Sequence, residues 1–252
     1  MTETYERPCD LCGKISHSHA DDYECKYCSI DHNECCYDKE LDCCKECAEK
    51  IQKMYVPTEL CNLAIKYGTD KWNFHHYTPH YHEMFKDRRN KVQKVLEIGI
   101  GDPASMADPS GKPYQPGASL RMWREYFPFA FIFALDNNPN ILIAETRIIS
   151  FLCDQGNEEW LKRILPELGT GFDLIVDDGS HVPEHQVNTA KLLVPLLAPH
   201  GIYVIEDVWE YPSQVGWSKE PFGLKLEDIP YKAEFIHCTP GNCDDRLVVI
   251  RA

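Results

Sequence analysis

The sequence has no apolar run approaching the roughly 18 residues that a helix needs to span a bilayer. Basic residues are also scarce: 26 lysines and arginines stand against 40 aspartates and glutamates, a formal net charge of −14. So acidic a chain lacks the basic clusters that neutralise phosphates, and nucleic acid is not expected as its main partner. Residues 1–6 are acidic and lack the apolar core of a secretory signal. We therefore expect a cytoplasmic protein with no membrane partner.

Cysteine is sparse after residue 61 and crowded before residue 50, where nine of the 13 cysteines lie. Fifteen residues separate Cys28 from Cys44, a spacing typical of four-cysteine zinc sites. Thiolates two residues apart can turn around one ion, whereas a disulfide framework would suit a secreted chain. We predict a metal-stabilised module with a structural or protein-contact role; the alternative is a reduced, poorly ordered tail. The expected zinc ligands form three Cys-x2-Cys pairs, Cys9 with Cys12, Cys25 with Cys28 and Cys44 with Cys47.

After residue 93 the sequence alternates short apolar runs with amphipathic stretches. Apolar runs of this length are typical of strands buried on both faces, as in a parallel sheet covered by helices. The pattern predicts an α/β fold with a doubly wound, mostly parallel, seven-stranded sheet. Strands are expected at 95–98, 131–135, 148–152, 174–176 and 202–205, with a closing hairpin of 233–238 and 246–251. Helices are expected at 58–67, 119–126, 158–168 and 187–197.

Composition divides the chain into three parts. Residues 1–54 form the cysteine-rich module, 55–92 a helical and aromatic segment, and 93–252 the sheet domain. Within the middle part, Thr58 and Gly68 mark the start and end of a helix. A loop rich in aromatics and histidines follows, which could cap a pocket or pack under the sheet. Its histidines, any of which could serve as a base or contact a ligand, are His75, His76, His80 and His82.

Two expected strands stop abruptly in carboxylates. The fourth leads into Asp177 and Asp178, with His181 three residues further on. The fifth leads into Glu206 and Asp207. Ligands bind beyond the carboxyl ends of parallel strands, and carboxylates gathered there repel one another unless a cation lies among them. The pattern indicates a metal site; helix-capping acids and solvated loop charges are the alternatives.

The first three strands end in features suited to a nucleoside. Glu97-x-Gly99-x-Gly101 follows the first strand, and glycine lets a backbone approach a ligand closely. The Gly-x-Gly-x-x-Gly fingerprint is incomplete, so a simple tight turn stays open. Asp136 ends the second strand, where an acid could accept ribose hydroxyls. Asp154 ends the third, where an acid could accept a hydrogen bond from an adenine amine.

Four stretches of the sequence together resemble the class I S-adenosylmethionine-dependent methyltransferases, whose fold is Rossmann-like. Within that class they are similar to the metal-dependent sugar O-methyltransferases of macrolide tailoring, the mycinamicin and macrocin enzymes, and to their rhamnosyl relatives. The aromatic stretch 68–79 belongs to the same resemblance, which covers about residues 60–250; the cysteine-rich module does not. The four stretches are 96–101 (LEIGIG), 119–128 (SLRMWREYFP), 153–155 (CDQ) and 177–181 (DDGSH).

The resemblance implies a magnesium ion held by Asp178, Glu206 and Asp207, with His181 as general base. Carboxylate oxygens suit this hard cation, which would lower the pKa of a substrate hydroxyl. An imidazole, with a pKa of about 6.5, could then accept the proton. Asp178 and His181 are thus the expected catalytic residues. The residues implied at the methyl donor are Tyr77, Thr78, Glu97, Gly99, Gly101, Ser119, Asp136, Asp154, Gln155 and Asp177.

We predict an S-adenosylmethionine-dependent, magnesium-assisted O-methyltransferase that acts on a hydroxyl of a sugar or glycosylated small molecule. A homo-oligomer and a protein partner for the cysteine-rich module are further expectations. Two alternatives stay open. One is a cephalosporin-hydroxylase-like enzyme on the same scaffold, which product analysis would distinguish. The other is a recruitment protein with a degenerate methyltransferase domain, which deletion of residues 1–54 would distinguish.

Overall fold

The chain divides into two compact units, Met1–Pro57 with Thr239–Asn242, and Thr58–Cys238 with Cys243–Ala252. In the first unit, two antiparallel pairs of very short strands are described, β1 (Tyr23–Glu24) with β2 (Asp31–His32) and β3 (Tyr37–Asp38) with β4 (Cys43–Cys44). The computed structural model describes residues 23–24, 31–32, 37–38, 43–44, 56–72, 74–104, 106, 113–208, 210–211, 222–238 and 245–252. Cys9, Cys12, Cys25, Cys28, Cys47 and the side chain of Cys44 lie outside the described residues, so zinc stays a prediction.

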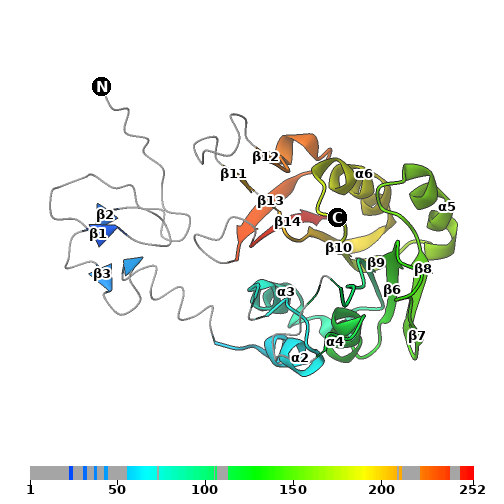
Figure 1. Ribbon diagram of the computed structural model, residues 1–252, viewed down its shortest axis with the longest axis horizontal. Coiled ribbons are helices and arrows are strands. Elements are labelled where there is room, and N and C mark those ends of the chain that lie inside the picture. Colours follow the sequence, from blue (N-terminus) through cyan, green and yellow to red (C-terminus); the bar gives the residue numbers. More distant parts are fainter. Residues whose placement is uncertain are drawn as a thin grey trace. The chain divides into compact units, whose positions relative to one another are not determined.

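One eight-stranded mixed sheet organises the second unit, in the order β13-β14-β10-β9-β5-β6-β8-β7 (Figure 1). The neighbours from β10 to β8 pair in parallel, whereas β7, β13 and β14 pair antiparallel with theirs. The strands are β5 (Lys94–Ile98), β6 (Phe131–Asp136), β7 (Ala144–Glu145), β8 (Ile148–Leu152), β9 (Phe172–Asp177), β10 (Leu197–Ile205), β13 (Ala233–His237) and β14 (Arg246–Arg251).

The α/β class is confirmed, and the seven expected strands are all present. The strand number is wrong by one: β7, two residues long, adds an eighth strand beside β8. Two residues give no alternating pattern, so the sequence held no signal for this edge strand. Strand order reverses after β5, since the chain continues through β6 to β8 on one side and returns to β9 and β10 on the other. Such a reversal places a crevice at the carboxyl ends of β5 and β9.

The helix α2 (Glu59–Tyr67) begins and ends where the sequence predicts. Thr58 accepts a hydrogen bond from the Cys61 backbone N–H at 3.3 Å, and Gly68 closes the helix with φ 74°. The crossover helix α6 (Pro183–Leu193) begins and ends four residues earlier than expected. Pro195 has no backbone N–H to continue the helix, so a 3-10 turn, η3 (Val194–Leu196), leads into β10.

The expected loop over residues 68–81 is partly wrong, because its second half forms α3 (Tyr77–Phe85). Pro79 falls in the first turn of this helix, where a missing N–H costs nothing. None of the described helices is long and apolar enough to cross a membrane. The remaining elements are α4 (Ala118–Tyr126), α5 (Glu158–Leu168), η2 (Arg89–Lys91), η4 (Leu226–Asp228), β11 (Glu210–Tyr211) and β12 (Phe222–Gly223).

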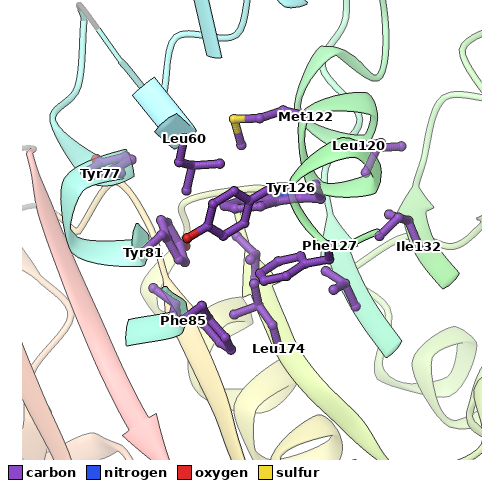
Figure 2. Close-up of a cluster of buried hydrophobic side chains, with 14 of the residues drawn as sticks. Leu60, Tyr77, Tyr81, Phe85, Leu120, Met122, Tyr126, Phe127, Ile132 and Leu174 are labelled. Carbon is purple, nitrogen blue, oxygen red and sulfur yellow. The ribbon is translucent and has the colours of Figure 1, made fainter. Parts of the chain in front are cut away.

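Helices cover both faces of the sheet. On one face α2, α3 and α4 pack over β5 and its neighbours, and on the other face lie α5 and α6 (Figure 1). Aromatic side chains dominate the first face, where Phe85 of α3 meets Phe127 edge-on with ring centres 5.3 Å apart (Figure 2). Tyr81 meets the buried Trp123 in the same way at 5.0 Å. This packing fixes α3 against the sheet and so brings its polar side chains to the crevice.

Candidate active site

A cavity of about 230 Å³ opens at the carboxyl ends of the central strands, where the strand order reverses. A smaller cavity of about 110 Å³ adjoins it and shares Gly99, Asp136 and Gly179 with it. None of the described residues that line the larger cavity is a lysine or arginine. Its wall is therefore strongly acidic and favours a cationic occupant. The aspartates that line it are Asp70, Asp102, Asp136, Asp178 and Asp207.

Two glycines after β5 form one wall of the larger cavity. Gly99 has φ 94° and Gly101 has φ 86°, in the region that favours glycine. A Cβ on Gly99 would overlap the backbone oxygen of Asp178, and a Cβ on Gly101 would overlap the hydroxyl of Tyr114. Gly99 therefore lets the β5 turn lie directly against the β9 turn, and Gly101 lets it lie against the Tyr114 side chain.

Six of the ten residues expected at the donor line one of the two cavities. Asp136 accepts hydrogen bonds from the backbone N–H of Ile100 and of Asn138, both at 2.8 Å. Asp154 accepts one from the Gly156 N–H at 2.9 Å. These acids are thus oriented by the turns that follow their own and neighbouring strands. The larger cavity is lined by Gly99, Gly101, Ser119 and Asp136, and the smaller one by Gly99, Asp136, Asp154 and Gln155.

The other four expected donor residues lie beneath the cavities and line neither. Glu97 is fully buried and accepts a 2.8 Å hydrogen bond from Trp123 Nε1. Tyr77 donates to Asp207 Oδ1 at 2.5 Å, and Thr78 donates to the sulfur of Cys61 at 3.2 Å. Burial raises the pKa of the Glu97 carboxyl. The structure therefore gives these three side chains internal partners.

Asp177, the fourth, supports the turn after β9. It accepts hydrogen bonds from Gln155 Nε2 at 2.6 Å and from the Tyr203 hydroxyl at 3.0 Å. Gln155 in turn accepts one from the Ser180 N–H at 2.8 Å. Complete burial raises the pKa of Asp177 to about 6, although the hydrogen bonds from Gln155 and Tyr203 lower it in part. Helix capping is excluded, because the cap of α6 is Val182, which makes no side-chain cap bond.

A metal-type cluster forms at the β9 and β10 ends. Asp178, His181 and Asp207 each offer a ligand atom, and these atoms lie within 4.8 Å of one another. The backbones of His181 and Asp207 have φ 56° and 52°, a strained conformation that often marks functional sites. His181 Nε2 lies 3.6 Å from Asp207 Oδ2, and its buried Nδ1 has no hydrogen-bond partner among the described residues. Two carboxylates with an imidazole fit a divalent cation.

Lys71 is the site residue that the sequence did not single out. Only 1% of its side chain is exposed, and its ammonium donates to Asp178 Oδ2 at 2.6 Å and to Glu206 Oε2. Glu97 Oε1 lies 3.2 Å away. Burial opposes the charge on Lys71, but the three carboxylates outweigh it and raise the pKa of the lysine well above its usual value.

Both carboxylate oxygens of Glu206, an expected metal ligand, have protein partners. Oε2 accepts from Lys71, and Oε1 accepts from the Tyr81 hydroxyl at 2.7 Å. The residue is 1% exposed, so a solvated loop charge is excluded. Glu206 is not a member of the Asp178–His181–Asp207 cluster. It is linked to the cluster through Lys71, whose ammonium contacts both Glu206 and Asp178.

Among the four histidines of the 68–85 segment, His75 faces the cluster. Its Nδ1 lies 3.3 Å from Asp245 Oδ1 and its Nε2 lies 3.6 Å from Asp207 Oδ1. Burial lowers the pKa of His75, but Asp245 and Asp207 outweigh it and raise the value to about 9. His76 also approaches Asp245, whereas His82 pairs with the Tyr126 hydroxyl at 2.9 Å, and burial lowers the pKa of His80.

The mixed α/β sheet has methyltransferases among its fold neighbours, and several curated relatives 35–40% identical to the chain are named O-methyltransferases. Mycinamicin VI 2''-O-methyltransferase of Micromonospora griseorubida is 40% identical over 152 residues, 60% of this chain and 36% of the relative. The 8-demethyl-8-(2-methoxy-alpha-L-rhamnosyl)-tetracenomycin-C 3'-O-methyltransferase of Streptomyces olivaceus is 39% identical over 154 residues, which are 61% of this chain and 37% of the relative. This chain thus spans little more than a third of either relative. No family model matches it.

Among solved structures, the MycE methyltransferase of the mycinamycin pathway, in complex with Mg, SAH and mycinamycin VI, aligns with a TM-score of 0.51. The two chains are 39% identical, over 60% of this chain and 40% of that one.

Proposed function

We propose that this chain carries an S-adenosylmethionine-dependent, magnesium-assisted O-methyltransferase activity directed at a hydroxyl of a sugar or glycosylated small molecule. One observation carries the proposal: the glycine-lined cavity and the Asp178–His181–Asp207 cluster share one acidic wall at the strand-order reversal. The names of the relatives support the acceptor class, since they are O-methyltransferases of mycinamicin VI and of a rhamnosyl-tetracenomycin C. The solved relative contains both magnesium and the donor product.

The donor side of the site suits S-adenosylmethionine. This molecule carries a positive sulfur, and the larger cavity presents five aspartates without a described lysine or arginine. Gly99 and Gly101 bring backbone to the cavity wall, where an extended ligand can lie against it. Asp136 would hold the ribose hydroxyls and Asp154 the adenine amine, as acids at these strand ends do in nucleotide-binding folds.

The metal side would be formed by Asp178 and Asp207, with Glu206 as the third expected ligand. Each oxygen of Glu206 already accepts one hydrogen bond, from Lys71 or from Tyr81, so an ion would be bound through a remaining lone pair. Magnesium prefers carboxylate oxygens and keeps positions open for substrate oxygens. When bound, it would supply positive charge that lowers the pKa of a hydroxyl beside it.

His181 would move the proton. It lines the cavity, and Asp207, 3.6 Å from its Nε2, can orient the ring. The imidazole would accept the acceptor hydroxyl's proton while the oxygen attacks the donor methyl group. A carbon–oxygen bond forms as the carbon–sulfur bond breaks, and the electron pair of that bond stays on sulfur, leaving a neutral thioether. Alignment of the oxygen, methyl carbon and sulfur supplies much of the acceleration.

Donor binding and methyl transfer test the proposal directly. The full chain, loaded with magnesium, is titrated with S-adenosylhomocysteine in a calorimeter, then supplied with methyl-labelled S-adenosylmethionine and a panel of glycosides. We expect saturable donor binding and label in the sugar of at least one glycoside. Absence of donor binding by the intact, metal-loaded chain would overturn the proposal. A product oxidised instead of methylated would favour the hydroxylase alternative, which no relative's name supports.

A further inference from the structure

Lys71 lies where three neighbouring strands of the sheet end. It comes from the segment between α2 and α3, and its ammonium meets Glu97 at the end of β5, Asp178 after β9 and Glu206 after β10. The ammonium donates hydrogen bonds to Asp178 and Glu206, and its third carboxylate contact, with Glu97 Oε1 at 3.2 Å, is an ion pair. The side chain is 1% exposed, which leaves no room for water to replace these contacts.

The three carboxylates differ in what their remaining oxygens do. Glu97 Oε2 accepts from Trp123, and Glu206 Oε1 accepts from Tyr81. Asp178, in contrast, lines the cavity and contributes an oxygen to the cluster with His181 and Asp207. Lys71, which does not line the cavity, donates to Asp178 Oδ2 and so orients this carboxylate toward the cavity.

Charge gives Lys71 a second role. Glu97 and Glu206 are almost fully buried, and burying carboxylates without a cation is costly. When ionised, the three carboxylates and the ammonium carry a formal charge of −2, and Asp207 of the same ion site adds one more negative charge, so the group attracts a divalent ion. Lys71 is therefore an internal cation that allows this carboxylate cluster to form before any ion arrives.

We propose that Lys71 is a positioning residue, an internal counter-cation that pre-forms the ion site by orienting Asp178 and permitting the burial of Glu97 and Glu206. The proposal rests on the proposed function in that it concerns the same ion site. It assigns no contact between Lys71 and donor or acceptor. It predicts that without Lys71 the chain depends on a divalent ion to hold the carboxylates together.

Stability with and without an ion tests this, using Lys71→Met in the full chain. In ion-free buffer we expect the melting temperature of K71M to fall by about 10 °C, because a buried carboxylate cluster loses its cation. Addition of millimolar Mn²⁺ or Mg²⁺ should raise the melting temperature of K71M by at least roughly 5 °C more than that of the wild type. The matched control is Lys66→Met, which removes an exposed lysine paired with Glu125 and should change neither value appreciably.

Two further variants distinguish a counter-cation from a residue that only attaches the segment between α2 and α3 to the sheet. Glu206→Gln combined with Lys71→Met removes one surplus charge, so K71M/E206Q should regain at least half of the lost melting temperature in ion-free buffer. Lys71→Arg keeps the charge and should stay near the wild type in its ion response. An ion response of K71M equal to that of the wild type, or a double variant no more stable than K71M, would overturn the proposal.

The two proposals fail differently. The measurements on Lys71 use neither donor nor acceptor, so a wild-type chain that transfers methyl groups while K71M shows no ion rescue removes only the role of Lys71. A wild-type chain that binds no donor, with K71M rescued by Mn²⁺, removes only the methyltransferase. If K71M yields no folded protein, the double variant in ion-free buffer decides: its failure to fold would also contradict the proposal.

Discussion

The proposed donor side and the proposed metal side of the site are held in different ways. On the donor side, Asp136 and Asp154 accept hydrogen bonds from backbone N–H groups two positions further along the chain. On the metal side, Asp178 is held by Lys71, 107 positions away, and Asp207 by Tyr77, 130 positions away. The donor side is thus held mostly by turns of the sheet itself, with Asp136 also accepting from the Ile100 N–H 36 positions away, whereas the metal side exists only when the segment before and within α3 packs on the sheet.

The largest expected effect is that of a substitution on the metal side alone. Asp178→Asn keeps the size of the side chain and an acceptor for Lys71 but removes the charge at the cluster. Under the proposed function, kcat should fall about 1000-fold, because the ion and the oriented hydroxyl are both lost. The dissociation constant for S-adenosylhomocysteine should change less than about threefold. Methyl-transfer assays and calorimetry check both values, and unchanged turnover in D178N would remove the metal mechanism.

A pH series probes Asp177, which lies between the two sides. Its folded pKa of about 6 exceeds the ordinary value of 3.8, so its favourable contribution to stability is complete below pH 3.8 and is lost as the pH rises to about 6. Above that pH the buried charge costs up to about 3 kcal/mol. Asp177→Asn escapes this cost, so its stability relative to the wild type should rise between pH 4 and pH 6 and then stay level. Urea unfolding at pH 4, 5, 6 and 7 measures the difference; a difference independent of pH would contradict the raised pKa.

The donor side can be weakened with the metal side intact. Asp136→Asn places an amide where two backbone N–H groups meet a carboxylate. Under the proposed function, it also removes the acid that would hold the ribose. We expect the dissociation constant for S-adenosylhomocysteine to rise about tenfold, since hydrogen bonds to charged groups contribute about 1.5 kcal/mol or more. The melting-temperature response to Mn²⁺ should match that of the wild type. Reduced ion response in D136N would show that the two sides are coupled.

The same contrast explains what the sequence could predict. Glycines, strand-end acids and helix caps act over a few residues, so Gly99, Asp136, Asp154 and the ends of α2 were accessible from local patterns. The position of Lys71 was not, because one lysine among 26 basic residues carries no mark of which carboxylates it will meet. The helix α3 was missed since the aromatic and histidine-rich run that forms it has low helix propensity, and packing against Trp123 and Phe127 overrides that preference.

The smallest expected effects come from removing the hydroxyls of two tyrosines of α3, Tyr81 and Tyr77. Tyr81 donates to Glu206, which is 1% exposed, whereas Tyr77 donates to Asp207, whose side chain is 22% exposed. Tyr81→Phe leaves a buried carboxylate oxygen without its donor, which should cost about 1 to 2 kcal/mol of unfolding free energy.

Tyr77→Phe removes both the donor to Asp207 Oδ1 and the acceptor of the Asp207 backbone N–H. Water can replace both partners at this partly exposed residue, so the stability loss should stay below about 1 kcal/mol. Its effect should instead appear in turnover, because Asp207 loses the hydroxyl that orients it. Urea unfolding and kcat are measured on both variants side by side. Equal stability losses would mean that Asp207 is as inaccessible to solvent as Glu206. The Asp178–His181–Asp207 cluster would then be as buried as the Lys71–Glu206 pair behind it.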